Sequence, residues 1–199
     1  MANILIVYGT TEGQTRKIAQ HVGGFIRAMG HNTEVIDSHG IRADFPIDGY
    51  NAYLIMGSLH QGHHQKALAH FVKKHEGIIG KAPSAFFSVS LIAAIKDANH
   101  EDDIEKSIEQ FSKETDWVPN EWLAVAGAMK PEAYDWYKRM ILNSVTKRIG
   151  SDAISTQDEE FTDWGALDAF VSEFLKKNFL LDMVRSTRDD DPSLAGVTG

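Results

Sequence analysis

A run of hydroxyl-bearing and small residues, Thr10–Thr15, follows directly on the apolar segment Ile4–Tyr8. The next segment, Lys17–Met29, carries its apolar residues at helical spacing. The run is therefore expected to form the turn between a buried strand and a helix. Hydroxyls and free backbone N–H groups at a helix N-terminus bind phosphate. No Lys or Arg precedes Thr15, so neutral donors would have to hold the anion.

The spacing of this turn matches neither the P-loop nor the dinucleotide-binding glycine pattern, and the lysine of the P-loop is missing. A second interpretation gives the turn no ligand at all. In that case Thr10 or Thr11 only caps the first helix. The turn by itself does not decide between a phosphate site and a simple helix cap.

Composition narrows the class of protein. The chain has 199 residues, of which 43% are hydrophobic and 24% charged, as in an ordinary globular domain. A formal net charge of −8 argues against a general nucleic-acid binder. The absence of cysteine excludes disulfides, thiolate metal sites and thiol catalysis. No signal peptide or apolar run of about 20 residues is evident, so a cytoplasmic location is expected.

Short apolar runs alternate with helical patterns along the chain. The strand candidates are Ile4–Tyr8, Thr33–Ile36, Tyr53–Gly57, Ser84–Val89 and Trp122–Gly127. Five strands alternating with helices predict a parallel sheet with helices on both faces. Ligands of such sheets bind beyond the carboxyl ends of the strands.

Two more strand ends are expected to meet the first turn at this edge of the sheet. Ser58–His63 follows the third strand, and Ser88–Ala93 closes the fourth. Both loops mix hydroxyls with apolar residues, and the first also contains glycine and histidine. A flat heterocycle held by backbone groups and tethered by a phosphate would suit a crevice of this kind.

The order of elements and the Thr10–Thr15 turn resemble those of flavodoxins, whose first loop has the pattern T-x-T-G-x-T and binds the FMN phosphate. Glu12 replaces the middle threonine, which removes one hydroxyl but leaves the backbone N–H. A closer similarity, along nearly the whole chain, is to the flavodoxin-type, quinone-dependent protoporphyrinogen IX dehydrogenases. It is carried by the segments His70–His75, Pro83–Val89, Ala126–Met129, Trp136–Tyr137 and Phe161–Trp164.

The resemblance implies a flavodoxin-like three-layer α/β/α sandwich with a five-stranded parallel sheet in the order 2-1-3-4-5. The FMN-binding domain would span residues 1–178, with a helical insertion at 130–160 after the fifth strand. Residues 179–199 would form a C-terminal extension that is largely a disordered tail. The implied activity is the FMN-dependent oxidation of protoporphyrinogen IX to protoporphyrin IX in haem synthesis, with electrons passed to a quinone.

Two other functions stay open. One is a flavodoxin electron carrier that serves a redox partner protein and has no small-molecule substrate of its own. The other is a flavodoxin-fold scaffold that no longer binds FMN. The acidic net charge suits a carrier that docks on basic partners, whereas the long insertion after the fifth strand does not.

The resemblance also assigns cofactor-binding residues. The FMN phosphate would be held by Thr10, Thr11, Glu12, Gly13, Gln14 and Thr15. The isoalloxazine would be held by two loops, formed by Ser58, Leu59, His60, Gln61, Gly62 and His63 and by Ser88, Val89, Ser90, Leu91, Ile92 and Ala93. A substrate with two propionates would prefer a cationic partner, and the candidates are Lys96, Lys130 and Arg139.

Histidines cluster in the loop after the third strand. His60 or His63 is the catalytic candidate, as a proton donor or acceptor at the flavin edge. The alternative is that both are solvated loop residues. His60 and His64 have the i, i+4 spacing of metal ligands, but Gly62 weakens that interpretation, and no metal is expected.

Residues 131–149 form the second unusual stretch. Aromatic and aliphatic residues recur there at helical spacing, and Lys130–Arg148 contains five basic and two acidic residues. A basic amphipathic helix can lie on an anionic membrane surface, which would place a quinone reductase at the inner face of the membrane. The alternatives are packing against its own sheet and a contact in a homo-oligomer.

Overall fold

The computed structural model describes residues 1–42, 44–94, 98–129 and 159–189. Its centre is a parallel sheet with the strand order β2-β1-β3-β4-β5, which confirms the expected order. The strands are β1 (Asn3–Gly9), β2 (Asn32–Asp37), β3 (Ala52–Ser58), β4 (Ser84–Ser90) and β5 (Glu121–Ala126).

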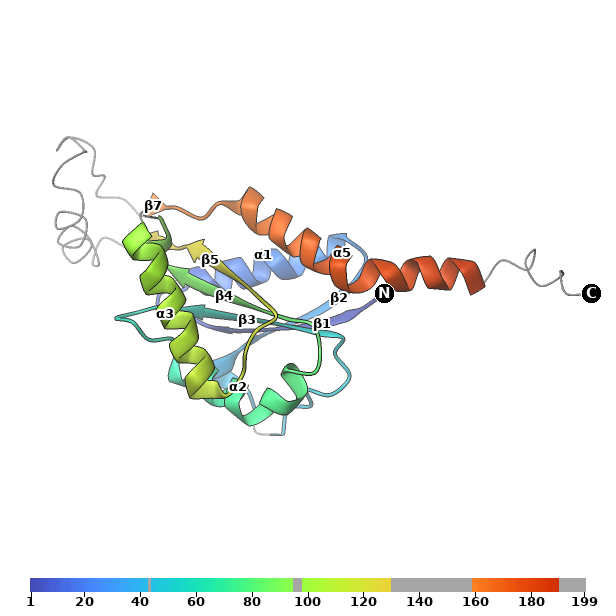
Figure 1. The fold of residues 1–199 in the computed structure, drawn as a ribbon, viewed down its shortest axis with the longest axis horizontal. Coiled ribbons are helices and arrows are strands. Elements are labelled where there is room, and N and C mark those ends of the chain that lie inside the picture. Colours follow the sequence, from blue (N-terminus) through green and yellow to red (C-terminus); the bar gives the residue numbers. More distant parts are fainter. Residues whose placement is uncertain (43, 95–97, 130–158, 190–199) are drawn as a thin grey trace, which may run out of the picture.

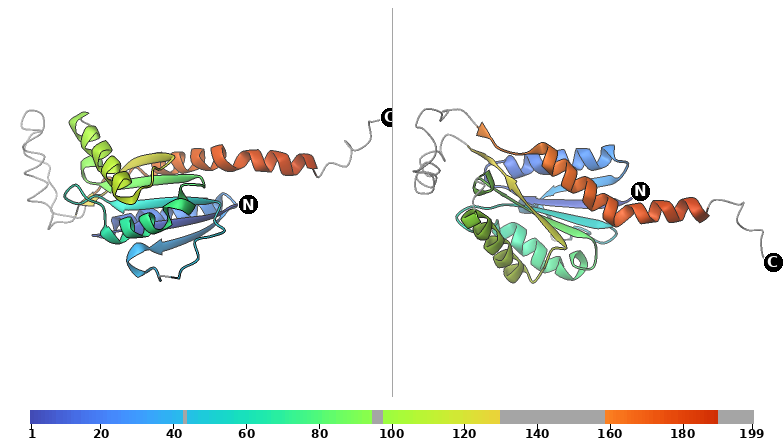
Figure 2. Two further views of the ribbon diagram at one scale, coloured as in Figure 1. Left: turned by 60° about the horizontal axis from the view of Figure 1, so that its bottom comes forward. Right: turned by 45° about the horizontal axis from the view of Figure 1, so that its top comes forward.

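Helices cover both faces of the sheet (Figures 1 and 2). On one face lie α1 (Gln14–Ala28) and α5 (Trp164–Asp189), and on the other lie α2 (Lys66–Ile79) and α3 (Ala98–Thr115). Two short 3-10 helices, η1 (Ser38–Gly40) and η2 (Ile92–Ala94), follow β2 and β4. The three-layer sandwich expected from the alternating patterns is thus the fold of the chain.

The sequence of β1 shows why the sheet needs cover on both sides. Ile4 and Ile6 face the core beneath α1 and α5, whereas Leu5 and Val7 face the core beneath α2 and α3. Since neighbouring side chains point to opposite faces, a strand buried on both faces must be apolar throughout. This burial fixes β1, and with it the turn that follows β1.

A small antiparallel ladder, not predicted from the sequence, extends from the end of β5. It pairs β6 (Ala128–Met129) with β7 (Glu159–Glu160) and brackets the predicted insertion. The interior of that insertion, residues 130–158, lies outside the described residues, and so does the proposed membrane-facing stretch 131–149. The ladder brings both ends of the segment together beside the first helix.

The C-terminal extension differs from expectation. Helix α5 continues to Asp189, so the last helix extends into the predicted C-terminal extension. The run Phe179-Leu180-Leu181, followed by Met183, consists of residues that tolerate a helix well. Residues 190–199 are outside the described part. Within the described ranges, no helix combines the length and the apolar character needed to cross a bilayer.

Candidate functional site

A cavity opens at the carboxyl ends of the parallel strands, where the sequence places the candidate site. Four segments line it: the turn after β1, the loop after β3, the end of β4 and the start of β6. The lining residues are Thr10, Thr11, Glu12, Gln14, Thr15, Ser58, Leu59, His60, Gln61, Gly62, Val89, Ser90, Leu91, Ile92, Gly127 and Ala128. The three loops that we expected to converge therefore do so.

The first turn is organised around Gly13, the N-cap residue of α1. Gly13 has φ +98°, in the left-handed region that glycine tolerates, and its N–H donates to the Thr10 hydroxyl over 2.9 Å. The prediction that Thr10 or Thr11 is the N-cap is therefore wrong, because the hydroxyl of Thr10 closes the turn and does not cap the helix. The first N–H groups of α1 have no carbonyl partner within the helix.

Thr15 is the residue of this turn that most clearly fits a ligand. Its side chain is completely buried, yet its hydroxyl has no hydrogen-bond partner. An unsatisfied buried hydroxyl costs about 1–3 kcal/mol. Because Thr15 also lines the cavity, a bound anion at the head of α1 would satisfy this group. The residues present thus fit a phosphate.

The cations nearest this turn are engaged elsewhere. The Arg16 guanidinium donates to the Tyr8 hydroxyl over 3.2 Å and lies 3.6 Å from Asp37. Lys17 forms an ion pair with Glu160 at 2.6 Å. With these two cations engaged, the turn itself offers hydroxyls and backbone amides as donors.

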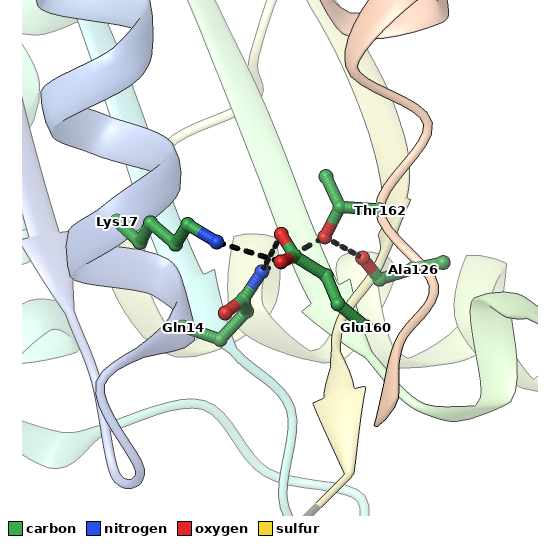
Figure 3. A network of polar contacts seen from close by, with 5 residues as sticks. All are labelled: Gln14, Lys17, Ala126, Glu160 and Thr162. Atoms are coloured by element: carbon green, nitrogen blue, oxygen red, sulfur yellow. Dashed lines mark hydrogen bonds and ion pairs between the residues drawn. The ribbon is translucent and has the colours of Figure 1, made fainter. Parts of the chain in front are cut away.

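Figure 3 shows a polar network that sequence analysis missed, on the α5 side of the turn. The Gln14 amide donates to Glu160 over 3.0 Å and to the Thr162 hydroxyl over 2.9 Å, and Thr162 donates to the Ala126 carbonyl over 2.7 Å. The hydrogen bond from Lys17 lowers the pKa of Glu160 below its ordinary value. We name this set of residues the Glu160 network; it joins the turn to β5 and β7.

A second connection lies on the α2 side and was also missed. The Gln65 amide nitrogen donates to the hydroxyl of Thr11 over 3.0 Å and to that of Ser58. The hydroxyls of Thr11 and Ser58 also hydrogen-bond each other over 3.3 Å. Gln65 thus joins the first turn to the loop after β3. Nothing in its sequence context marks it as a site residue, since it lies beyond the predicted loop.

The loop after β3 is a tight hairpin turn. His60 and His63 exchange backbone hydrogen bonds of 2.9 and 3.1 Å around Gln61 and Gly62, whose φ values are +50° and +80°. Positive φ at both central residues is the geometry of a type I′ turn. His60 lines the cavity, whereas the His63 ring lies 3.1 Å from the Gln110 amide. The described residues contain no group of three candidate metal ligands.

His64, directly after this hairpin, is half-buried and packs against the sheet. Its ring packs edge-on against Phe86 and Phe111, and its Nε2 lies 3.1 Å from the Ser88 hydroxyl. Burial lowers the pKa of His64 to about 4, so the ring is neutral near pH 7. A Cβ at Gly57 would stand 2.9 Å from this ring, which explains the glycine at the end of β3.

The structure separates the predicted site residues into two groups. Most of them line the cavity, and the four that do not are Gly13, which shapes the first turn, His63, Ser88 and Ala93. Ser88 contacts His64, and the N–H of Ala93 donates to the Ser90 hydroxyl over 3.2 Å. The three cations proposed for the propionates, Lys96, Lys130 and Arg139, lie outside the described residues.

The chain is similar to a family of flavodoxin domains and to individual proteins of known name. The family described as Flavodoxin domain matches residues 5–155. The protoporphyrinogen IX dehydrogenase [quinone] of Escherichia coli K12 is 30% identical over 169 residues, covering 85% of this chain and 92% of the relative. The Leishmania major protein of the same name is 30% identical over 173 residues, covering 85% and 73%. Oxidised flavodoxin 2 from Bacillus cereus shares the fold, with TM-score 0.54 and 16% identity over 88% of this chain and 99% of that one.

Proposed function

The chain belongs to the flavodoxin family, and on that premise we propose that it is an FMN-dependent oxidoreductase. Its proposed reaction is the oxidation of protoporphyrinogen IX to protoporphyrin IX, with electrons passed to a quinone. The observation that carries the cofactor assignment is the buried, unpartnered hydroxyl of Thr15 in the turn at the head of α1. The substrate assignment is supported by the dehydrogenases that match over 85% of the chain.

The residues of the turn would bind the phosphate of FMN. The Thr15 hydroxyl would donate a hydrogen bond to the phosphate, and the free N–H groups of the first turn of α1 would add the favourable end of the helix dipole. Gly13 keeps the turn in its left-handed conformation. FMN, when bound, supplies the chemistry that accepts and releases electrons, and the protein positions it.

The two remaining loops would hold the flat ring. Leu59–Gly62 and Val89–Ile92 both line the cavity. The N–H of Leu59 donates to the Val89 carbonyl over 2.7 Å, so the two loops are fixed against each other. His60 lies at the cavity, where it would donate or accept a proton beside the ring. His63, turned to Gln110, would support the hairpin.

An electron carrier for a redox partner protein is the second candidate. The net charge of −8 supports it, since acidic carriers dock on basic partners. The two candidates differ in what reduces the protein. An enzyme of the proposed type takes electrons from a porphyrinogen, whereas a carrier takes them from a protein.

The test is an anaerobic half-reaction with the FMN-loaded protein. Protoporphyrinogen IX should bleach the flavin absorbance near ~450 nm, and a quinone added afterwards should restore it over repeated cycles. If the porphyrinogen leaves the flavin oxidised while a reductase protein bleaches it, the carrier is the correct assignment. A His60→Ala variant that retains FMN should show slower bleaching.

A further inference from the structure

Gln65 is placed between the two parts of the site that would hold the two ends of a nucleotide-like ligand. Its amide nitrogen donates one hydrogen bond to Thr11 in the first turn and one to Ser58 in the loop after β3. An amide nitrogen has two donors, so both are used. Thr11 and Ser58 belong to different loops, 47 positions apart in sequence, and their hydroxyls also share a direct hydrogen bond of 3.3 Å.

The side chain of Gln65 does not cap the helix that it precedes. Gln65 is the N-cap residue of α2, yet it makes no side-chain cap to that helix. Ser, Thr, Asn or Asp at an N-cap stabilises a helix by about 0.5–2 kcal/mol relative to a residue that does not cap. Glutamine at this position forgoes that gain, and its amide bridges the two loops.

Packing holds the amide in this orientation. The side-chain oxygen of Gln65 is buried without a hydrogen-bond partner, and it would lie 2.8 Å from a Cβ at Gly9, at the end of β1. Gly9 is therefore needed for the side chain to fit against the sheet. The amide is fixed against β1 and hydrogen-bonds both Thr11 and Ser58. A movement of either residue would therefore break a hydrogen bond to Gln65 or pull the other residue with it.

We propose that Gln65 is a positioning residue that couples the phosphate-binding turn to the ring-binding loop, so that occupation of one strengthens binding at the other. This inference rests on the proposed FMN site. Coupling between two subsites is reciprocal. A ligand that fixes the Thr11 turn also restrains the Ser58 loop through Gln65. The loop then loses less conformational entropy when the ring binds.

The test uses inorganic phosphate and riboflavin as two separate ligands in place of FMN. In the wild-type protein, saturating inorganic phosphate should raise riboflavin affinity by about 3- to 10-fold, within the usual range of coupling energies. In Gln65→Met, which keeps the length of the side chain without its donors, the factor should fall to the smaller value that the direct Thr11–Ser58 hydrogen bond sustains alone. The control is Gln110→Met, which removes the amide contact to His63 alone and should leave the factor unchanged.

Amide hydrogen exchange of the ligand-free protein provides a measurement that needs no flavin. Gln65→Met should speed exchange at residues 10–13 and at 58–60 together, whereas Gln110→Met should act near His63 only. Exchange that rises at one loop alone would overturn the coupling, even if the protein bound no flavin. Coupled exchange in a protein that binds neither riboflavin nor FMN would instead contradict the proposed function. A phosphate factor that is as large in Gln65→Met as in the wild type would also overturn the inference.

Discussion

The phosphate-binding turn is held on its two sides by different kinds of contact. On the α2 side the Gln65 amide nitrogen contacts two hydroxyls, and the amide oxygen is buried without a hydrogen-bond partner. On the α5 side the Glu160 network uses an ion pair whose Lys17 side chain is 57% exposed. Exposed ion pairs are weak and screened by salt. We therefore expect the neutral contacts on the α2 side to fix the geometry of the turn. The charged contacts on the α5 side should add little to its stability, by an amount that depends on salt.

The largest effect should come from Gly13, which lies between the two sides. Gly13→Val places a β-branched residue at φ +98°, a strain of about 1–3 kcal/mol or more. If the turn changes conformation to relieve this strain, its contacts on both sides are displaced. FMN affinity should then fall by about 100-fold. Flavin fluorescence titration measures this.

Gly30→Val is the matched control for Gly13→Val. Gly30 follows the other end of α1 with φ +86° and has open space around it. The substitution should lower stability similarly and leave FMN affinity unchanged. Equal loss of FMN affinity in both variants would show that general destabilisation, and not the turn, is responsible.

Acid should weaken the α2 side before the α5 side, because His64 adjoins Gln65. His64 has a folded-state pKa of about 4, against about 6.5 unfolded. Above pH 6.5 the ring is neutral in both states. As the pH falls from 6.5 to 4, the unfolded chain binds the proton first, and about 3 kcal/mol of stability is lost.

Urea unfolding at several pH values measures this loss. His64→Phe, which can pack with Phe86 and Phe111, should flatten the profile between pH 4 and 6.5 relative to the wild type. If the two profiles are parallel in that range, the ring of His64 does not titrate as its burial implies.

Thr15→Val should produce two effects of opposite sign. Removing the unpartnered hydroxyl should raise the unfolding free energy of the ligand-free protein by about 1 kcal/mol, because a buried polar group without a partner disappears. The same change should weaken FMN binding by about 10-fold, since a phosphate contact is lost. Thermal unfolding and fluorescence titration measure the two effects.

Thr115→Val is the control for Thr15→Val. Thr115 is equally buried, but its hydroxyl donates to the Phe111 carbonyl over 2.8 Å. Its replacement should destabilise the protein and leave FMN affinity unchanged. Destabilisation by Thr15→Val as well would mean that its hydroxyl already has a partner.

Glu160→Gln should have the smallest effect, below about 1 kcal/mol of stability in low salt and close to none in 1 M salt. The pKa of folded Glu160 is lowered, so its contribution is present above the unfolded pKa and is lost as the pH falls through the folded one. Glu121→Gln, which breaks the 2.8 Å pair with Lys177, is the control. A salt-independent loss in Glu160→Gln would contradict the comparison.

The sequence predicts the sheet and the three loops well because both depend on local patterns. Apolar runs identify buried strands, and Thr10–Thr15 and Ser58–His63 lie at strand ends. Gln65 and Glu160 could not be found in this way. Each is an ordinary polar residue whose role comes from contacts across the fold, with Thr11 and Lys17 respectively. The ladder of β6 and β7 was missed because its two strands have only two residues each.

Titration of the ligand-free protein with FMN and with riboflavin, in a buffer without phosphate, tests the central claim most directly. We predict one FMN per chain and binding of riboflavin that is at least about 10-fold weaker, because the turn at the head of α1 holds the phosphate. Equal affinity for the two flavins, or no binding of either, would contradict the assignment of Thr10–Thr15 as the phosphate site.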